Sequence, residues 1–598
     1  MRFSGIGWAG TSMPDDYRPT ARTISTRAGV RGMRGSPYRR VGVSACRRVG
    51  AHSATPRSMA ATRHAGAIAA HRPNLRHCRI VADRHATGCP RMTLPLRPLI
   101  RYGVAVALVG AIGYAGYMLS RLAPIATGYA AKALCSGVFV SRRPPASVID
   151  VDIMAGVHPL LNLVRPAIDP EHRRAVATFA GFARREADFR PGLGCTLALA
   201  PTDGVLPAAL PPFPASPAVS PTDSPAGSPA PSPADPPAVS PTDPPARSPA
   251  RPPADPPAAP PADIDARKLQ TALDRAFDEP DPARPRRTRA VVVMWRGRVI
   301  AERYASGFTA DTPLPGWSMT KTVTAALAGV LVAQHKLSPD ASSLLPEWRG
   351  TGDRRAAITL DELLRMTSGL QFNEDYDDPL SDVTVMLFTQ PDTARFASAK
   401  PLVAAPGTLW SYSSGTSAIV ARVMREAMGG SEADYLAFPR RALFAPLEMR
   451  SAVFEPDASG TLGSASFMYA SARDWARFGQ LLLQDGVWNG QRLLPEGWVR
   501  YLTRATPEAP RGEFGAHLWV KVPAPFDDRD PHARALPADA FHAVGHEGQF
   551  VSVIPSRELV VVRLGLSRPE SAWNHDAFLA RVLDAVPAAP AAGAREGM

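Results

Sequence analysis

The stretch Ser318-Met319-Thr320-Lys321 places a hydroxyl and an amine three residues apart, just where a helix is predicted to begin. Pro315-Gly316 interrupt the chain before it, and apolar residues then recur at helical spacing, so residues 318–336 are predicted to form a core-facing helix. Positions three apart share a helix face, and the N–H groups at a helix start favour a negatively charged oxygen. The pattern predicts a self-activated serine nucleophile, with an ordinary N-cap serine as the alternative.

Two further elements occur downstream in a characteristic order. The loop 406–414, Pro-Gly-Thr-Leu-Trp-Ser-Tyr-Ser-Ser, presents Tyr412 before another predicted helix. Gly545-His546-Glu547-Gly548-Gln549 then lies between two strand-like runs. Together with Ser318 and Lys321, these elements resemble the serine β-lactamase and penicillin-binding protein superfamily. The Tyr motif matches its branch of class C β-lactamases, esterases and 6-aminohexanoate-dimer hydrolases.

The resemblance extends over roughly residues 265–586, because the segments 358–370 and 470–479 are also similar to segments of that family. It implies an α/β fold of the β-lactamase/transpeptidase type, with an antiparallel sheet flanked by helices plus a helical subdomain. The residues agree: they predict a helix near Leu269 to Phe277, a hairpin from Ala290 to Tyr304, strands over 541–554 and 559–564, and a last helix over 573–586.

The chemistry of such a site requires a base, because a serine hydroxyl is a poor nucleophile until its proton is removed. Lys321 can serve if burial lowers its pKa, and Tyr412 can relay protons if a nearby ammonium keeps it ionised. The sequence leaves open which of the two is the base. The resemblance implies that the oxyanion is held by the backbone N–H groups of Ser318 and Gln549.

The third motif departs from the family pattern, because His546-Glu547-Gly548 stands where β-lactamases carry K-T-G. A histidine is largely neutral at pH 7 and binds a substrate carboxylate weakly, which favours ester or amide hydrolysis over β-lactam chemistry. Ser414 stands where an Asn is common. We assign His546, Gly548 and Ser414 to substrate binding, and expect aromatic residues to line the cleft or the core: Trp317, Tyr376, Trp410 and Trp519.

No cofactor and no metal are predicted. His542 and His546 are four residues apart, but on predicted strands that spacing does not bring two imidazoles to one ion. No H-E-x-x-H motif or paired C-x-x-C motif occurs in the sequence.

The net charge of +14 resides entirely in residues 1–91, which hold 17 Arg, no Lys, three Asp and no Glu. Such a segment has the charge of a nucleic-acid-binding arm. The residues after Met92 favour a different interpretation, in which translation starts there and residues 1–91 are a mispredicted or disordered extension. We therefore predict no nucleic-acid partner.

Residues 92–122 have the character of a membrane anchor. Arg97 and Arg101 precede an uncharged run from Tyr102 to Ser120, long enough to span a bilayer. The basic side is expected in the cytoplasm, which predicts a single-pass inner-membrane protein with a periplasmic catalytic domain.

Between the anchor and the catalytic domain, residues 123–200 hold the last two cysteines, Cys135 and Cys195, which we predict to form a disulfide in an oxidising compartment. A strand over 148–151 and a helix over 173–185 are predicted there. This small region is either a spacer or a lid. Residues 201–263 are rich in Pro, Ala and Ser and are predicted to be an extended linker.

These observations predict a membrane-anchored serine hydrolase with its catalytic domain over residues 264–590. Ser318 is expected to attack a small ester or amide substrate and form an acyl-enzyme. Two alternatives stay open: a D-Ala-D-Ala carboxypeptidase or β-lactamase, and a catalytically silent binding protein that uses the same cleft. The sequence does not indicate an oligomeric state.

Overall fold

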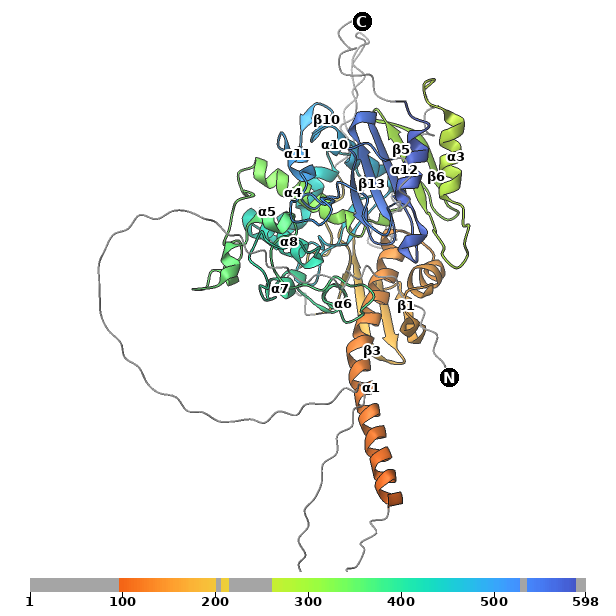
Figure 1. Ribbon diagram of the computed structural model, residues 1–598, viewed down its shortest axis with the longest axis vertical. Coiled ribbons are helices and arrows are strands. Elements are labelled where there is room, and N and C mark those ends of the chain that lie inside the picture. The colour runs from red at the N-terminus through yellow and green to blue at the C-terminus, as the bar shows by residue number, and fades with distance from the viewer. Residues whose placement is uncertain (1–95, 200–205, 214–260, 528–534, 588–598) are drawn as a thin grey trace, which may run out of the picture. The chain divides into compact units, whose positions relative to one another are not determined.

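The computed structural model describes residues 96–199, 206–213, 261–527 and 535–587 (Figure 1). The predictions for residues 1–91, for the start at Met92 and for most of the Pro-rich linker lie outside the described residues. The elements from residue 109 onward belong to one compact unit.

A five-stranded antiparallel sheet, in the order β12-β13-β14-β5-β6, forms the centre of the catalytic part. Its strands are β5 (Ala290–Trp295), β6 (Arg298–Tyr304), β12 (Phe541–Gly545), β13 (Gln549–Ile554) and β14 (Leu559–Leu564). The predicted hairpin and the predicted late strands are confirmed. The first hairpin closes at Arg296-Gly297, where both residues have positive φ.

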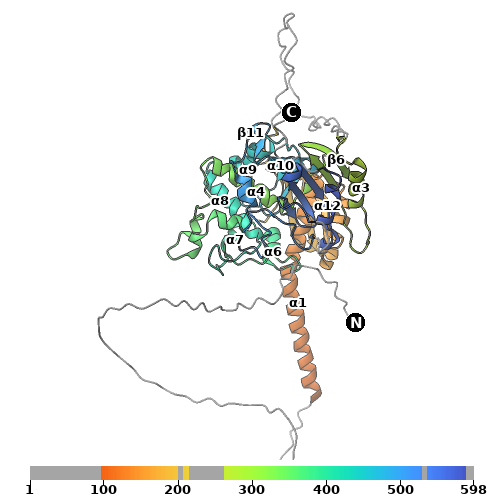
Figure 2. The same ribbon diagram turned by 45° about the horizontal axis from the view of Figure 1, so that its top comes forward.

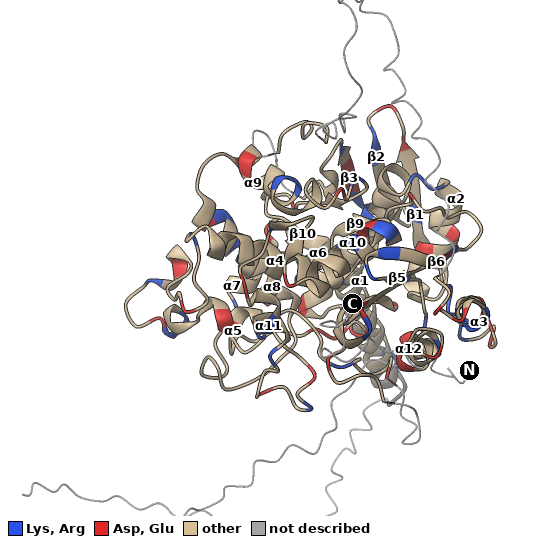
Figure 3. Cartoon of the chain, turned by 90° about the horizontal axis from the view of Figure 1, so that it is seen from above, with Lys and Arg blue, Asp and Glu red and all other residues tan. Residues whose placement is uncertain are grey.

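Both faces of this sheet are buried, because side chains alternate along each strand. In β5, Val292 and Met294 join the core that includes α10 (Ala472–Leu483), whereas Val291 and Val293 join the core beneath α3 (Ala266–Ala276) and α12 (His575–Leu583). Figure 3 shows α3 and α12 together on one side of β5 and β6. The predicted first and last helices thus cover one face of the sheet.

The helical subdomain lies beside the sheet, and α4 (Met319–Ala333) runs between the two (Figures 1 and 2). Because α4 packs against α8 on one side and β12 on the other, residues 319–331 are all buried. The helices of this part are α5 (Leu360–Leu364), α6 (Asp382–Thr389), α7 (Thr393–Ser398), α8 (Ser414–Met428), α9 (Glu432–Pro439) and α11 (Trp498–Thr503). Its short strands are β7 (Leu314–Pro315), β8 (Val453–Phe454), β9 (Met468–Ala470), β10 (Val487–Trp488) and β11 (Gln491–Arg492). The expected β-lactamase/transpeptidase-like architecture is confirmed.

The region before the linker differs from its prediction. Helix α1 (Leu96–Cys135) leads into a π-helix over 148–154, which replaces the predicted strand, and into the sheet β1-β2-β3-β4. The strands are β1 (Val164–Asp169), β2 (Arg174–Phe179), β3 (Phe182–Arg190) and β4 (Gly194–Leu197). The predicted helix over 173–185 is therefore wrong. Its Arg and Ala content favours a helix, but Ala175, Ala177 and Phe179 alternate into a core, so packing overrides propensity.

This region is joined to the catalytic part by buried polar contacts. Cys135 and Cys195 are bonded to each other, and beside them Lys132 Nζ lies 2.6 Å from Glu455 Oε2 in a buried ion pair. The peptide N–H of Cys195 also donates to Glu455 at 2.7 Å. Residues 206–213, predicted as linker, pack instead on the catalytic part, where Phe213 lies under Arg440.

Candidate active site

Ser318 lies at the start of α4, as predicted, and its surroundings position the hydroxyl. Trp317 before it has a φ of +47°, a strained backbone turn that leads into the helix. Behind it, β12 approaches so closely that a Cβ on Gly545 would lie 2.2 Å from the carbonyl oxygen of Gly316. Only glycine at position 545 allows the third motif to lie against the start of α4.

The amine of Lys321 is the centre of a buried polar cluster. Its Nζ lies 2.9 Å from Ser318 Oγ, 3.1 Å from Ser414 Oγ and 2.9 Å from the carbonyl oxygen of Ala465. Burial lowers the pKa of Lys321 to about 8, against a smaller upward effect of the Glu374 carboxylate. A substantial fraction of this amine is therefore neutral near pH 8.

The hydrogen-bond directions around Lys321 fix where a neutral amine presents its lone pair. The carbonyl of Ala465 can only accept. The hydroxyl of Ser414 donates its proton to Glu374 Oε1 at 2.6 Å, so it too accepts from Lys321. A neutral amine has two N–H groups, and these two partners use both. Its lone pair is then left for the proton of Ser318.

Glu374 is the residue of the candidate site that sequence reasoning missed. Its carboxylate accepts hydrogen bonds from the hydroxyl and the peptide N–H of Ser414, at 2.6 and 2.7 Å. Burial raises the pKa of Glu374, and the nearby Lys321 lowers it in part. In the sequence, Glu374 is one of several acidic residues in the loop 373–378, which has the pattern of a solvated surface. Only the fold distinguishes it from its neighbours.

Ser414 differs from its predicted role. We assigned it to substrate binding, but it is fully buried between Lys321 and Glu374, at the first turn of α8. Its hydroxyl is committed to these two partners. Ser414 therefore connects the Glu374 carboxylate to the Lys321 amine through hydrogen bonds.

Tyr412 lies on the other side of the lysine, with Lys321 Nζ 5.1 Å from the centre of its ring. The ring stacks on Trp519 and meets Phe514 edge-on. Burial raises the pKa of Tyr412, the Glu374 charge raises it further, and a hydrogen bond to Ser318 lowers it only in part. The expected ionised phenol is thus replaced by a neutral one, which can donate a proton.

The third motif forms the turn between β12 and β13. Burial lowers the pKa of His546, but the Glu570 carboxylate 2.7 Å from Nδ1 outweighs it, so that the pKa is raised overall. The Glu570 carboxylate thus favours the charged form of this histidine, an effect that the sequence did not indicate. His546 is paired with Glu570, and Glu547 is paired with Arg568 at 2.5 Å. His546 and Arg568 thus already have carboxylate partners.

Gly548 and Gln549 complete this turn. Gly548 has a φ of +84°, and a Cβ there would lie 2.4 Å from Arg563 Nη1, so packing against the protein interior explains this glycine. Gln549 begins β13, and its side-chain amide bonds to the backbone of His546 and Gly565 at 3.0 and 2.8 Å. These hydrogen bonds hold the turn in place from the interior of the protein.

The aromatic residues divide between two places. Tyr376 stacks on His546 with ring centres 4.7 Å apart, and Trp317 meets the same imidazole edge-on. Trp410 and Trp519 pack with Phe514 beside Tyr412. His542 bonds to Ser552 Oγ at 2.8 Å. The part of the chain that the structure describes holds no group of three His, Cys, Asp or Glu side chains placed to bind a metal ion.

An antiparallel sheet, a helical subdomain and a Ser-Lys pair at their junction define the class of serine β-lactamase-like proteins. The sequence model of the Beta-lactamase family matches residues 273–583, slightly more than half of the chain. The protein belongs to this family.

A 6-aminohexanoate-dimer hydrolase of Paenarthrobacter ureafaciens is 27% identical over 225 residues, which are 36% of this chain and 56% of that enzyme. The match thus spans little more than half of the relative. Among solved structures, a putative 6-aminohexanoate-dimer hydrolase from Bacillus anthracis is 21% identical with a TM-score of 0.40, covering 53% of this chain and 80% of that one. A putative β-lactamase from Bacteroides dorei is 20% identical with a TM-score of 0.42, covering 54% and 99%.

Proposed function

We propose that the protein is a serine hydrolase that cleaves ester or amide bonds through an acyl-enzyme on Ser318. The observation that carries this proposal is the orientation of Lys321, whose two fixed acceptors leave its lone pair for the Ser318 proton. In the first step, Lys321 takes this proton while Oγ attacks the carbonyl carbon. The backbone N–H groups of Ser318 and Gln549 are assigned to the resulting oxyanion.

Tyr412 is assigned to the leaving group. Because its phenol stays protonated, it can give its proton to the departing alcohol or amine and then recover one through Lys321. Water next attacks the acyl-enzyme, loses a proton to the same pair of groups, and releases the acid and free Ser318. In this mechanism Lys321 is the general base and Tyr412 is the general acid.

Ester or amide substrates are favoured over β-lactams and D-Ala-D-Ala peptides by charge. Both of those competing substrates carry a carboxylate that needs a cation. Here His546 is paired with Glu570, and Arg568 with Glu547, so the electrostatic attraction for a further anion is weakened.

The test uses the full-length protein in detergent and compares it with Ser318→Ala. We expect turnover of short nitrophenyl esters that is lost in the variant, together with an acyl adduct on Ser318 detected by mass spectrometry. Turnover of a chromogenic cephalosporin at comparable efficiency would instead support the cell-wall alternative. Absence of Ser318-dependent activity on either substrate would support the silent binding protein.

We also propose that α1 anchors the enzyme in the inner membrane with its catalytic part in the periplasm. The helical segment Arg101–Val140 is long and apolar enough to cross a membrane, and its early residues Tyr102, Val106, Val109 and Ile112 are exposed. The Cys135–Cys195 bond fits an oxidising compartment. Retention in the membrane pellet after alkaline extraction, and digestion of the catalytic part by protease added to spheroplasts, are the expected results.

A further inference from the structure

An apolar pocket of about 110 Å³ lies next to the candidate active site. One side of it consists of residues from the catalytic part: Trp317, Tyr376, Asp377, Pro379, Thr384, Phe388, His546 and Glu547. Trp317 is the neighbour of Ser318, and Tyr376 stacks on His546 of the third motif. The pocket is thus bounded by Trp317, which precedes Ser318 in the chain, and by the Tyr376–His546 stack of the third motif.

The other side of the pocket comes from outside the family match, which begins at residue 273. Leu122, Ile125, Ala126 and Tyr129 lie on one face of α1, at the i, i+3, i+4 and i+7 positions of a helix. Val157, His158, Leu160 and Leu161 complete this side. The residues preceding the linker therefore build half of the pocket.

The wall formed by α1 is held close to the catalytic part. At Gly128, a Cβ would lie only 2.2 Å from the carbonyl oxygen of Phe388, so the helix touches α6 through a glycine. At the next residue, the ring of Tyr129 meets the ring of Phe388 edge-on, with centres 5.3 Å apart. A shift of α1 would open the pocket and break both contacts.

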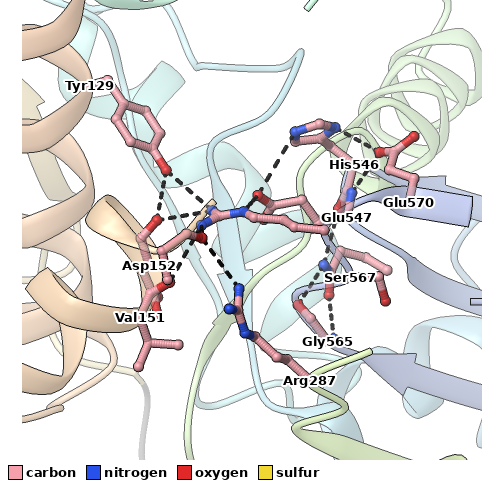
Figure 4. A network of polar contacts seen from close by, with 12 residues as sticks. Tyr129, Val151, Asp152, Arg287, His546, Glu547, Gly565, Ser567 and Glu570 are labelled. Carbon is pink, nitrogen blue, oxygen red and sulfur yellow. Dashed lines mark hydrogen bonds and ion pairs between the residues drawn. The ribbon is translucent and has the colours of Figure 1, made fainter. Parts of the chain in front are cut away.

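Tyr129, Asp152 and Glu547 lie in one polar network (Figure 4), and Arg568 connects the wall to the third motif within it. Its guanidinium lies 2.5 Å from Glu547 Oε1 and donates to the carbonyl oxygens of Asp152 and Ala155 at 2.9 and 3.0 Å. It also reaches the hydroxyl of Tyr129 at 3.4 Å. Groups from two parts of the chain thus share one buried cation, which fixes the wall relative to the His546 turn.

We propose that this wall makes the pocket an acyl-binding site, so that the enzyme prefers esters or amides of short, unbranched apolar acids. The proposal rests on the proposed function of Ser318. A volume of about 110 Å³ is somewhat smaller than the cavity of about 150 Å³ that encloses benzene in another protein, and we therefore expect it to suit butanoyl to hexanoyl chains. Each methylene buried there improves binding by up to about fourfold.

The proposed preference for esters or amides of apolar acids also fits the position of the pocket along α1. Leu122 and Ile125 lie directly after the apolar run that ends at Ser120. With a rise of about 1.5 Å per residue, the first wall residues lie within about 10 Å of the end of the proposed membrane segment. Amphiphilic substrates that concentrate at a membrane surface would therefore enter the pocket close to that surface.

The test measures kcat/KM for nitrophenyl acetate, butyrate, hexanoate and octanoate with the full-length protein in one detergent. We expect kcat/KM to rise from acetate to hexanoate, by tenfold or more, and to level off at octanoate. In Ala126→Trp, which fills the pocket, the ratio of hexanoate to acetate should fall at least tenfold. Ala115→Trp, at an exposed position of the same helix, is the matched control and should keep the wild-type ratio.

An unchanged ratio in Ala126→Trp, or a flat chain-length series in the wild type, would overturn the acyl-pocket proposal while leaving Ser318 hydrolysis intact. Lack of Ser318-dependent acetate turnover is a different result and would overturn the proposed function itself. If Ala126→Trp does not fold, as judged by its thermal unfolding, Leu122→Trp tests the same wall one turn earlier. An equal drop of the ratio in Ala115→Trp would also refute the assignment.

Discussion

Replacement of Glu374 by Gln should move the acidic limb of the pH–rate profile to lower pH. In the native protein, the Glu374 carboxylate raises the pKa of Lys321 and so opposes the effect of burial. Glutamine keeps the size of the side chain and an oxygen that can accept from Ser414, but it removes the negative charge. Lys321 then loses its proton at a lower pH, and the neutral base is available earlier in a titration.

The magnitude can be worked out from two distances. Ser414 Oγ lies 3.1 Å from Lys321 Nζ and 2.6 Å from Glu374 Oε1, so the two charges are no more than about 6 Å apart. At an effective dielectric constant of about 20, they interact by roughly 3 kcal/mol, equivalent to about two pKa units. Because Glu374 is partly exposed, solvent screening reduces this, and we expect a shift of about one unit.

The assay is kcat/KM for nitrophenyl acetate as a function of pH, since this parameter reports the ionisation of the free enzyme. The wild-type acidic limb is expected near the Lys321 pKa of about 8, and the Glu374→Gln limb about one unit below. Asp375→Asn removes the same charge from the exposed neighbouring residue and should leave the limb in place. A limb that stays or moves upward in Glu374→Gln would refute the assignment of Lys321 as the base.

Three further outcomes are expected. Tyr412→Phe should lower kcat for ester hydrolysis by roughly 10²- to 10⁴-fold without loss of fold, because the proton donor is lost while the ring still stacks on Trp519; a rate within threefold of wild type would exclude this role. Glu570→Gln should lower the pKa of His546. Because the pKa of His546 is raised in the folded protein, the His546–Glu570 pair stabilises the fold fully below about pH 6.5, and this contribution is lost as pH rises through the folded pKa. The Glu570→Gln variant should therefore lose more thermal stability relative to wild type at pH 6 than at pH 9. Equal losses at the two pH values would contradict the pairing. Cys135→Ser with Cys195→Ser opens a crosslink between residues 60 positions apart and should destabilise the protein by about 4 kcal/mol, measured by denaturant unfolding against the oxidised wild type. The reduced wild type should unfold like the variant, and an unchanged midpoint in the variant would show that the bond constrains little.

Local patterns in the sequence determined much of the catalytic part. The helical spacing of the apolar residues after Ser318 predicted α4, and the strand-like pattern of apolar residues predicted the strands from Ala290 to Tyr304 and from Phe541 to Leu564. These predictions succeeded because the apolar side chains that form the pattern are the ones that each element buries. The order of Ser318, Tyr412 and His546 then indicated the family. These signals are local or depend only on chain order, so a sequence can carry them.

Contacts between distant segments were decided by the tertiary structure alone. Glu374 and Ser414 are 40 residues apart, and nothing in either segment indicates that their side chains meet beside Lys321. Arg568 and Asp152 are still farther apart, so the α1 region could be predicted only as a spacer or a lid. The helix predicted over 173–185 failed for the same reason, because the core that buries Ala175 and Ala177 lies outside that segment. The sequence indicated the candidate residues Ser318, Lys321 and Tyr412, and long-range packing decided their polar partners and the pocket that lies beside the third motif.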